Sequence, residues 1–88
     1  DQATRMAGMA DLTVYTTSWC SFCRRLKSSL DRNEIEYTEI DIETDPAAAE
    51  FVGSVNGGNH VVPTVKFADG STKTNPGIGE VMAELGLL

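Results

Sequence analysis

Cys20 and Cys23 are the only two cysteines of this chain, and they stand three positions apart between Trp19 and Arg24. A thiol pair at this spacing can carry out disulfide exchange. One thiolate attacks a disulfide, and the second thiol can attack the mixed disulfide that results. A bond between the two would close a very short loop and constrain little of the unfolded chain. The spacing therefore indicates redox chemistry and not a structural cross-link.

The residues around this pair predict a strand before it and a helix after it. Residues 12–16 are rich in β-branched and aromatic side chains, which are typical of a buried strand. One face of the following segment repeats at helical spacing: Cys23, Leu26, Lys27 and Leu30. Cys20 then lies where the helix begins, and unpaired backbone N–H groups and the helix dipole favour a thiolate there. We expect Cys20 to be the nucleophile and Cys23 the second thiol.

Length and charge predict one small acidic domain. The chain has 88 residues and a formal net charge of -6, which argues against nucleic acid or an anionic membrane as its main partner. Basic residues gather on the first helix, where Arg24 and Lys27 either form a solvated surface or raise the potential near Cys20. Both roles are compatible.

The sequence shows neither a membrane span nor a secretory signal. No apolar run is long enough to span a membrane, and residues 1–10 lack the basic start and apolar stretch of a secretory signal. We expect residues 1–10 to be a flexible tail, left by processing or added to the protein, and residues 11–88 to be the domain. A cytoplasmic location follows as an expectation, since cysteines cycle in a reducing compartment.

The middle of the chain predicts a second strand and a second helix. Residues 36–42 mix isoleucine and tyrosine with acidic residues and are interpreted as a strand. Asp45 and Pro46 suit the N-cap and first position of a helix, and Gly57 and Gly58 suit its end. The apolar face expected for this helix comprises Ala48, Phe51, Val52 and Val55.

The last third predicts a hairpin and a third helix. Residues 64–68 and 71–74 flank an Asp-Gly turn signal, and residues 75–76 are expected to open the last helix. The order is β-α-β-α-β-β-α, and right-handed crossovers make the first two strands parallel. The predicted fold class is α/β, with a four-stranded mixed sheet flanked by three helices on both faces.

Three stretches carry a resemblance to a known family: TTSWC at 16–20, AAEFVGSVNGGN at 48–59 and VPTVKFADGST at 62–72. With them, residues 12–88 resemble the glutaredoxin branch of the thioredoxin fold, and more narrowly the mycoredoxins of actinobacteria. The resemblance implies that Pro63 is cis and that its loop faces Cys20, although general frequencies favour a trans bond. It implies that Cys20 is the attacking cysteine and that mycothiol, not glutathione, is the thiol partner. The backbone of Val62 would pair with the ligand as a short added strand.

One departure from ordinary glutaredoxins concerns the segment before the last helix. Glutaredoxins usually carry a Gly-Gly pair followed by an acidic residue that holds glutathione, whereas residues 74–78 read TNPGI. The missing acidic anchor favours a sugar-based thiol such as mycothiol. Trp19 and Phe22 would flank the sugar or pack against a protein partner, and Trp19 could equally cap the core. The implied ligand contacts are Thr17, Trp19, Ser21, Phe22, Val62, Pro63, Asn75 and Pro76.

The activity expected from this resemblance is reduction of protein–mycothiol mixed disulfides with mycothiol as electron donor. Cys23 would either close a Cys20–Cys23 disulfide as a side state or serve a dithiol route. One alternative is a dithiol redoxin reduced by a thioredoxin reductase. Another is an iron–sulfur cluster held by Cys20 and bridging two chains.

We expect a monomer with no metal and no tightly bound cofactor. A closed zinc site needs four ligands, and this chain offers only Cys20, Cys23, His60 and carboxylates. His60 lies in a Gly- and Asn-rich loop, where it is either a solvated side chain or a titratable group beside the thiols.

Overall fold

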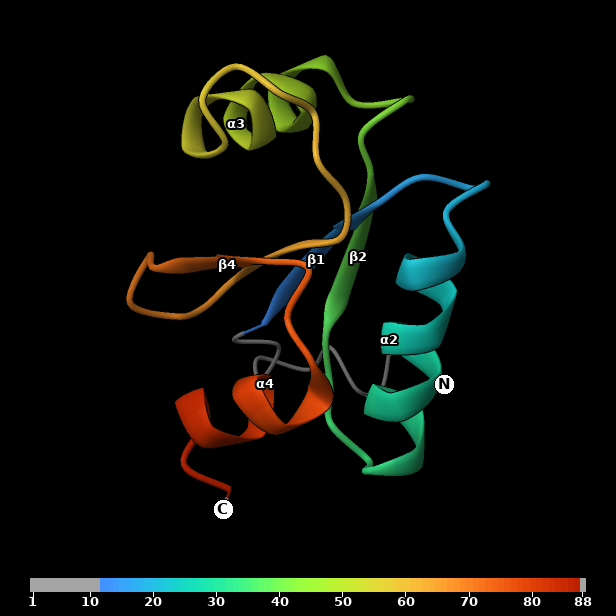
Figure 1. Cartoon of the computed structure of the whole chain (residues 1–88), viewed down its shortest axis with the longest axis vertical. Helices are drawn as coiled ribbons and strands as arrows, with labels where there is room; N and C mark the ends of the chain where they lie inside the picture. Colours follow the sequence, from blue (N-terminus) through green and yellow to red (C-terminus); the bar gives the residue numbers. More distant parts are fainter. Residues whose placement is uncertain (1–11, 88) are drawn as a thin grey trace.

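The computed structural model describes residues 12–87, which form seven elements in the predicted order (Figure 1). They are β1 (Thr13–Thr16), α2 (Ser21–Arg32), β2 (Thr38–Asp41), α3 (Pro46–Val55), β3 (Thr64–Lys66), β4 (Thr72–Thr74) and α4 (Ile78–Glu84). The strands form one sheet in the order β2-β1-β3-β4. β1 runs parallel to β2, and the β1–β3 and β3–β4 pairs are antiparallel. The mixed four-stranded sheet is confirmed; the expected tail, residues 1–10, lies outside the described residues.

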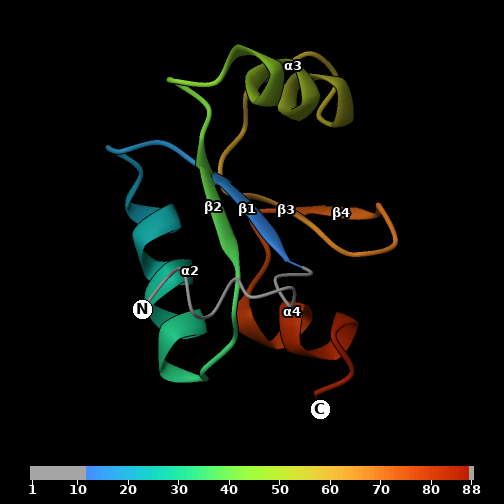
Figure 2. The same ribbon diagram turned by 180° about the vertical axis from the view of Figure 1, so that it is seen from behind.

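Helices cover both faces of the sheet, because the side chains of β1 alternate between two cores. Val14 packs with Leu30 of α2 and Val81 of α4 on one face. Tyr15 packs with Val52 of α3 on the other face. Figures 1 and 2 show α3 set apart from α2 and α4 in both views. Burial of each large apolar side chain stabilises the fold by about 1.5–3 kcal/mol.

Both ends of α3 follow the predicted signals. The Asp45 carboxylate accepts the backbone N–H of Ala48 at 3.1 Å, and Pro46 is the first helical residue. The helix ends before Gly57 and Gly58, which adopt φ angles of 67° and 95°. These left-handed angles favour glycine. The Asp-Gly turn is confirmed in the same way, by a φ of 88° at Gly70.

The bounds of all four strands and one apolar position were predicted wrongly. β1 begins at Thr13 and not at residue 12. β2 occupies residues 38–41 and not 36–42, since its partner β1 is only four residues long. The hairpin strands occupy residues 64–66 and 72–74 and not 64–68 and 71–74, because the N–H of Phe67 already closes the turn onto the Ser71 carbonyl. Val55 is 38% exposed, since it is the last helical residue of α3, next to the exposed glycine loop.

The last helix begins later than predicted, because residues 75–76 belong to a connector. Gly77 is the N-cap of α4, and its backbone N–H donates to Glu80 Oε1 at 2.9 Å. Asn75 adopts a φ of 49°, and its N–H donates to the Pro63 carbonyl oxygen at 2.7 Å. Pro76 is buried. The connector is therefore tied to the loop that precedes β3.

Candidate active site

Cys20 occupies the N-cap of α2, where the polypeptide leaves β1 and turns into the helix. Its N–H donates to the Thr17 carbonyl oxygen at 3.4 Å. The backbone N–H of Cys23 donates to Cys20 Sγ at 3.1 Å. A donor aimed at the sulfur and the positive end of the helix dipole both stabilise negative charge there. The predicted position of Cys20 at the start of the helix is confirmed.

Cys23 lies one turn further into the same helix. Both cysteines are buried, Cys20 with 5% and Cys23 with 0% of its surface exposed. The pKa of Cys23 is raised to about 12, first by burial and then by the hydrogen bond and charge of Cys20, against the lowering effects of a Thr17 backbone hydrogen bond and the charge of Lys27. Cys23 is therefore a neutral thiol at physiological pH, whereas Cys20 is the sulfur that accepts a backbone N–H at the start of the helix. No disulfide joins them in this structure.

The loop before β3 faces the N-terminus of α2. The Val62–Pro63 peptide bond is cis, as the resemblance implied. The Cys20 thiol donates to the Val62 carbonyl oxygen across an Sγ–O distance of 3.8 Å. The two stretches, 42 positions apart in the chain, thus meet at the reactive sulfur.

A pocket of about 360 Å³ opens beside Cys20. It is lined by Trp19, Cys20, Ser21, Phe22, His60, Val61 and Val62. Trp19 is 67% exposed, so it does not cap the core, and its indole N–H donates to Glu43 Oε2 at 2.8 Å. Phe22 is 53% exposed and lines the same pocket. Two exposed aromatic rings therefore line the pocket beside Cys20.

A second pocket, of about 320 Å³, shares Phe22 with the first. Its other lining residues are Arg25, Leu26, Ser29, Asn75, Pro76, Gly77 and Ile78. The Arg25 guanidinium lies 5.8 Å from the centre of the Phe22 ring. The eight residues expected to contact ligand thus fall mainly into two pockets, one on each side of Phe22.

Two of those eight residues line neither pocket. Pro63 is buried next to Val62 and shapes the loop from within. Thr17 is 6% exposed, and its hydroxyl oxygen has no hydrogen-bond partner among residues 12–87. Their positions indicate support of the site and not direct contact with a ligand in the pockets described above.

His60 reaches the first pocket because α3 carries a glycine beneath it. A Cβ on Gly53 would lie 3.3 Å from His60 Cδ2, a closer approach than side chains usually make. The imidazole is exposed and forms one wall of the pocket beside Cys20. His60 is thus a solvent-exposed side chain that lies beside Cys20.

Lys27 was expected to belong to a solvated surface or to raise the potential near Cys20, and the structure pairs it with Glu39 of β2. Its ammonium lies 2.8 Å from Glu39 Oε2. Burial tends to raise the pKa of Glu39, but the hydrogen bonds from Lys27 and from the Thr16 hydroxyl outweigh it, so the pKa is lowered. Arg24 is exposed at the start of α2. Lys27 thus forms an ion pair between α2 and β2, and its charge still favours a thiolate at Cys23.

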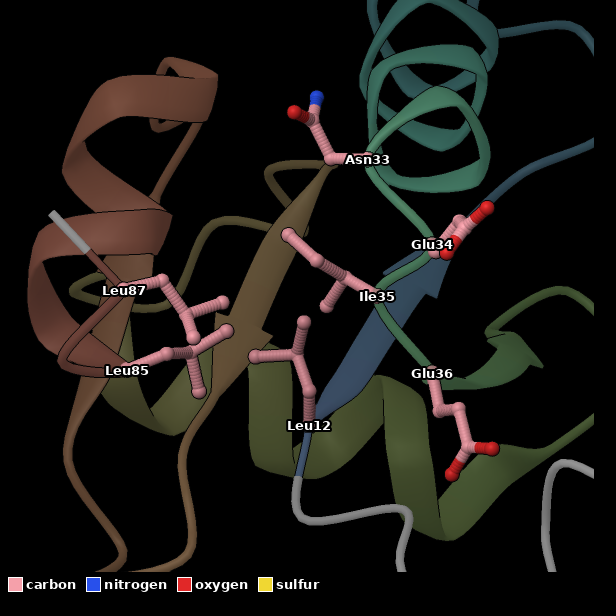
Figure 3. Close-up of a pocket in the computed structure, with 7 residues that line it drawn as sticks. All are labelled: Leu12, Asn33, Glu34, Ile35, Glu36, Leu85 and Leu87. Atoms are coloured by element: carbon pink, nitrogen blue, oxygen red, sulfur yellow. The ribbon is translucent and has the colours of Figure 1, made fainter.

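A further pocket, of about 440 Å³, lies at the opposite end of α2 (Figure 3). Its apolar side chains turn toward one another, whereas Glu34 and Glu36 point away. The twelve-residue helix separates this pocket from Cys20 by roughly 18 Å at about 1.5 Å per residue. It therefore takes no part in the chemistry of the cysteines.

Residues 12–87 contain neither a metal-binding cluster nor a helix that could cross a membrane. No group of three or more His, Cys, Asp or Glu side chains is arranged to hold a metal ion. The described helices are also too short or too polar to cross a bilayer.

Sequence reasoning missed Glu43 and Arg25 as parts of the site. The Trp19–Glu43 hydrogen bond joins residues 24 positions apart, and no local sequence pattern predicts it. Arg25 follows Phe22 by three positions on an exposed helix face, and that spacing was a usable signal for their contact.

Comparisons with known proteins agree with this geometry. A family model described as Glutaredoxin matches residues 12–71. A Mycobacterium tuberculosis protein named "putative glutaredoxin" is 68% identical over 76 residues, which cover 86% of this chain and 90% of that protein. Mycoredoxin 1 of Corynebacterium glutamicum is 47% identical over 77 residues, covering 88% and 95%. A solved glutaredoxin from Archaeoglobus fulgidus has a TM-score of 0.71 and 25% identity, over 89% of this chain and 88% of that one. The resemblance and the thioredoxin-type fold are confirmed.

Proposed function

Because the chain belongs to the glutaredoxin family, we propose that it reduces protein–mycothiol mixed disulfides, with Cys20 as the nucleophile and mycothiol as the electron donor. The observation that carries the proposal is the inequality of the two thiols. Cys20 accepts an N–H at the start of α2 and lines an open pocket, whereas Cys23 is fully buried and neutral. Attack from one sulfur only follows from that inequality.

The proposed reaction consists of two exchanges. The Cys20 thiolate attacks the mycothiol sulfur of the mixed disulfide, a Cys20–mycothiol disulfide forms, and the protein thiolate leaves and takes a proton from solvent. A second mycothiol thiolate then attacks the mycothiol sulfur, so that mycothiol disulfide is released and Cys20 returns as a thiolate. Two electrons pass from two mycothiols to the protein disulfide. Mycothiol is thus a co-substrate, and the reaction needs no resident cofactor.

Two observations support mycothiol over glutathione. The second pocket has no acidic side chain among its lining residues, and the nearby Glu80 carboxylate already accepts the Gly77 N–H. An anchor for the α-amino group of glutathione is therefore missing there. The exposed faces of Trp19 and Phe22 offer apolar surfaces to a sugar ring beside Cys20. Similarity to Mycoredoxin 1 points the same way.

The test is a comparison of electron donors with one mixed-disulfide substrate. Mycothiol should support turnover at least about tenfold better than glutathione, the difference expected from one missing charged contact. Cys20→Ser should abolish turnover and Cys23→Ser should retain it. Turnover with thioredoxin reductase and NADPH alone would show instead a dithiol redoxin, and visible charge-transfer absorption of the purified protein would show a cluster protein. We place the reaction in the cytoplasm, with the protein acting as a monomer.

A further inference from the structure

Asn56, the C-cap residue of α3, joins three segments that meet behind the loop before β3. Its Nδ2 donates to the Val52 carbonyl oxygen at 2.9 Å and to Thr64 Oγ1 at 3.1 Å. Its Oδ1 accepts the Thr74 hydroxyl at 2.6 Å. Both amide hydrogens and the amide oxygen are thus used. One side chain links the end of α3, the start of β3 and the end of β4.

The link continues from Asn56 to the backbone that faces the nucleophile. Thr64 is 0% exposed, and while its Oγ1 accepts from Asn56 its hydroxyl donates to the Val61 carbonyl oxygen at 2.8 Å. The next residue, Val62, presents its carbonyl oxygen to Cys20 Sγ. Two hydrogen bonds and one peptide unit therefore separate the Asn56 side chain from the Val62 carbonyl group beside Cys20.

A second path leads from the same amide to the second pocket. Thr74, which donates to Asn56, precedes Asn75, whose backbone N–H donates to the Pro63 carbonyl oxygen at 2.7 Å. Asn75 lines the second pocket, and Val62 lines the first. Asn56 itself is not among the residues that line either pocket.

We propose that Asn56 is a positioning residue for disulfide exchange, which holds the Val61–Val62 backbone in the place where a disulfide substrate docks beside Cys20. The inference rests on the proposed function only in taking Cys20 as the nucleophile, and it does not depend on which thiol is the donor. Without the Asn56 side chain the loop loses the side-chain hydrogen bonds that join Thr64 to the end of α3 and to Thr74 of β4. Docking then weakens, whereas the N–H bond to Cys20 Sγ stays in place.

Asn33 provides a matched control, because it caps α2 as Asn56 caps α3. Its Nδ2 donates to the Ser29 carbonyl oxygen, four positions back, at 2.8 Å. Asn56 makes the same bond to Val52. Asn33 lies at the far end of α2 and has no bond to the loop before β3. The pair separates the loss of a helix cap from the loss of loop positioning.

The experiment measures two rate constants at Cys20 in protein with Cys23→Ser, so that each adduct stays on one sulfur. One reagent is a mixed disulfide of a peptide with N-acetylcysteine, whose amide groups need the Val62 backbone. The other is iodoacetamide, which needs no docking. In Asn56→Ala the disulfide rate should fall about tenfold, a change equal to about 1.4 kcal/mol, and the iodoacetamide rate should stay within about twofold.

Further variants make each outcome decisive. Asn33→Ala should lower stability while leaving both rates unchanged. Thr74→Val removes only the bond to Asn56 Oδ1 and should slow the disulfide reaction by about threefold, and Thr74→Ser should restore it. If Asn56→Ala and Asn33→Ala lose stability alike and keep the wild-type ratio of rates, Asn56 is a helix cap and nothing more. Should Asn56→Ala fail to fold, an unchanged ratio in Thr74→Val overturns the proposal. Absence of a Cys20 adduct in the parent protein would refute the proposed function instead.

Discussion

Replacing Cys20 by serine should leave a protein whose remaining thiol is almost inert near neutral pH. The pKa of Cys23 is raised from an ordinary 9.0 to about 12, and burial is the largest cause. Near pH 7.5 this lowers the thiolate fraction roughly a thousandfold, and the greater nucleophilicity of a more basic thiolate returns roughly twentyfold. The expected alkylation rate is therefore about fiftyfold below that of an ordinary thiol, before its complete burial slows it further. Loss of Cys20 removes only secondary causes of the shift.

Iodoacetamide alkylation followed by mass spectrometry provides the assay. Native Cys20→Ser protein should react at least about fiftyfold more slowly than the same variant in urea, where Cys23 is exposed. The native rate should also rise about tenfold for each pH unit up to the neighbourhood of pH 12. Cys23→Ser is the control, and its single thiol should react readily in the folded state. Equal rates for Cys23 in native and unfolded protein would refute the reasoning from burial.

Three further predictions concern stability. Asp45→Ala should lower the free energy of unfolding, measured in urea, by about 1 kcal/mol, because the hydrogen bond to the Ala48 N–H is lost. Asp45→Asn should retain most of this stability, and equal losses in both variants would contradict the assignment of Asp45 as the N-cap. A double-mutant cycle of Lys27→Met and Glu39→Gln should give a coupling of about 0.5 kcal/mol near pH 7. Since the pKa of Glu39 is lowered in the fold, this stabilisation is present above its unfolded pKa and is lost as pH falls through the folded one, so a coupling independent of pH would be the wrong result. Gly53→Ala should leave stability equal or higher by up to about 1 kcal/mol, because helix propensity improves and the exposed His60 ring can move away. The ring-proton NMR signals of His60 should shift in this variant, and a large loss of stability would show that the His60 ring cannot move.

The order of the elements and the place of Cys20 could be predicted because they depend on local signals. A β-branched run, a helical repeat of apolar residues and an Asp-Pro cap each involve neighbours in the chain. The strand ends could not be predicted in the same way, since β2 stops where its partner β1 stops. Asn75 adopts its left-handed angle in a connector whose N–H bonds to Pro63, twelve positions earlier, and this delays α4.

The walls of the site were only partly predictable, for a related reason. The cis bond before Pro63 followed from the family resemblance, whereas general frequencies favoured trans. The ion pair of Lys27 with Glu39 was not predicted, because it joins a helix residue to a strand residue twelve positions later in the chain. The contacts of Asn56 with Thr74 span 18 positions and depend on the packing of α3 against the hairpin. Such contacts exist only once the sheet has formed.

The most direct test of the central claim is to identify the sulfur that a mixed disulfide first attaches to. Cys23→Ser protein should be mixed with a mycothiolated peptide, quenched with acid and digested for mass spectrometry. Mycothiol on Cys20, with release of free peptide thiol, is the result that the proposed reaction requires. Cys20→Ser protein treated alike should carry no adduct on Cys23. An adduct on Cys23, or peptide instead of mycothiol on Cys20, would contradict the account.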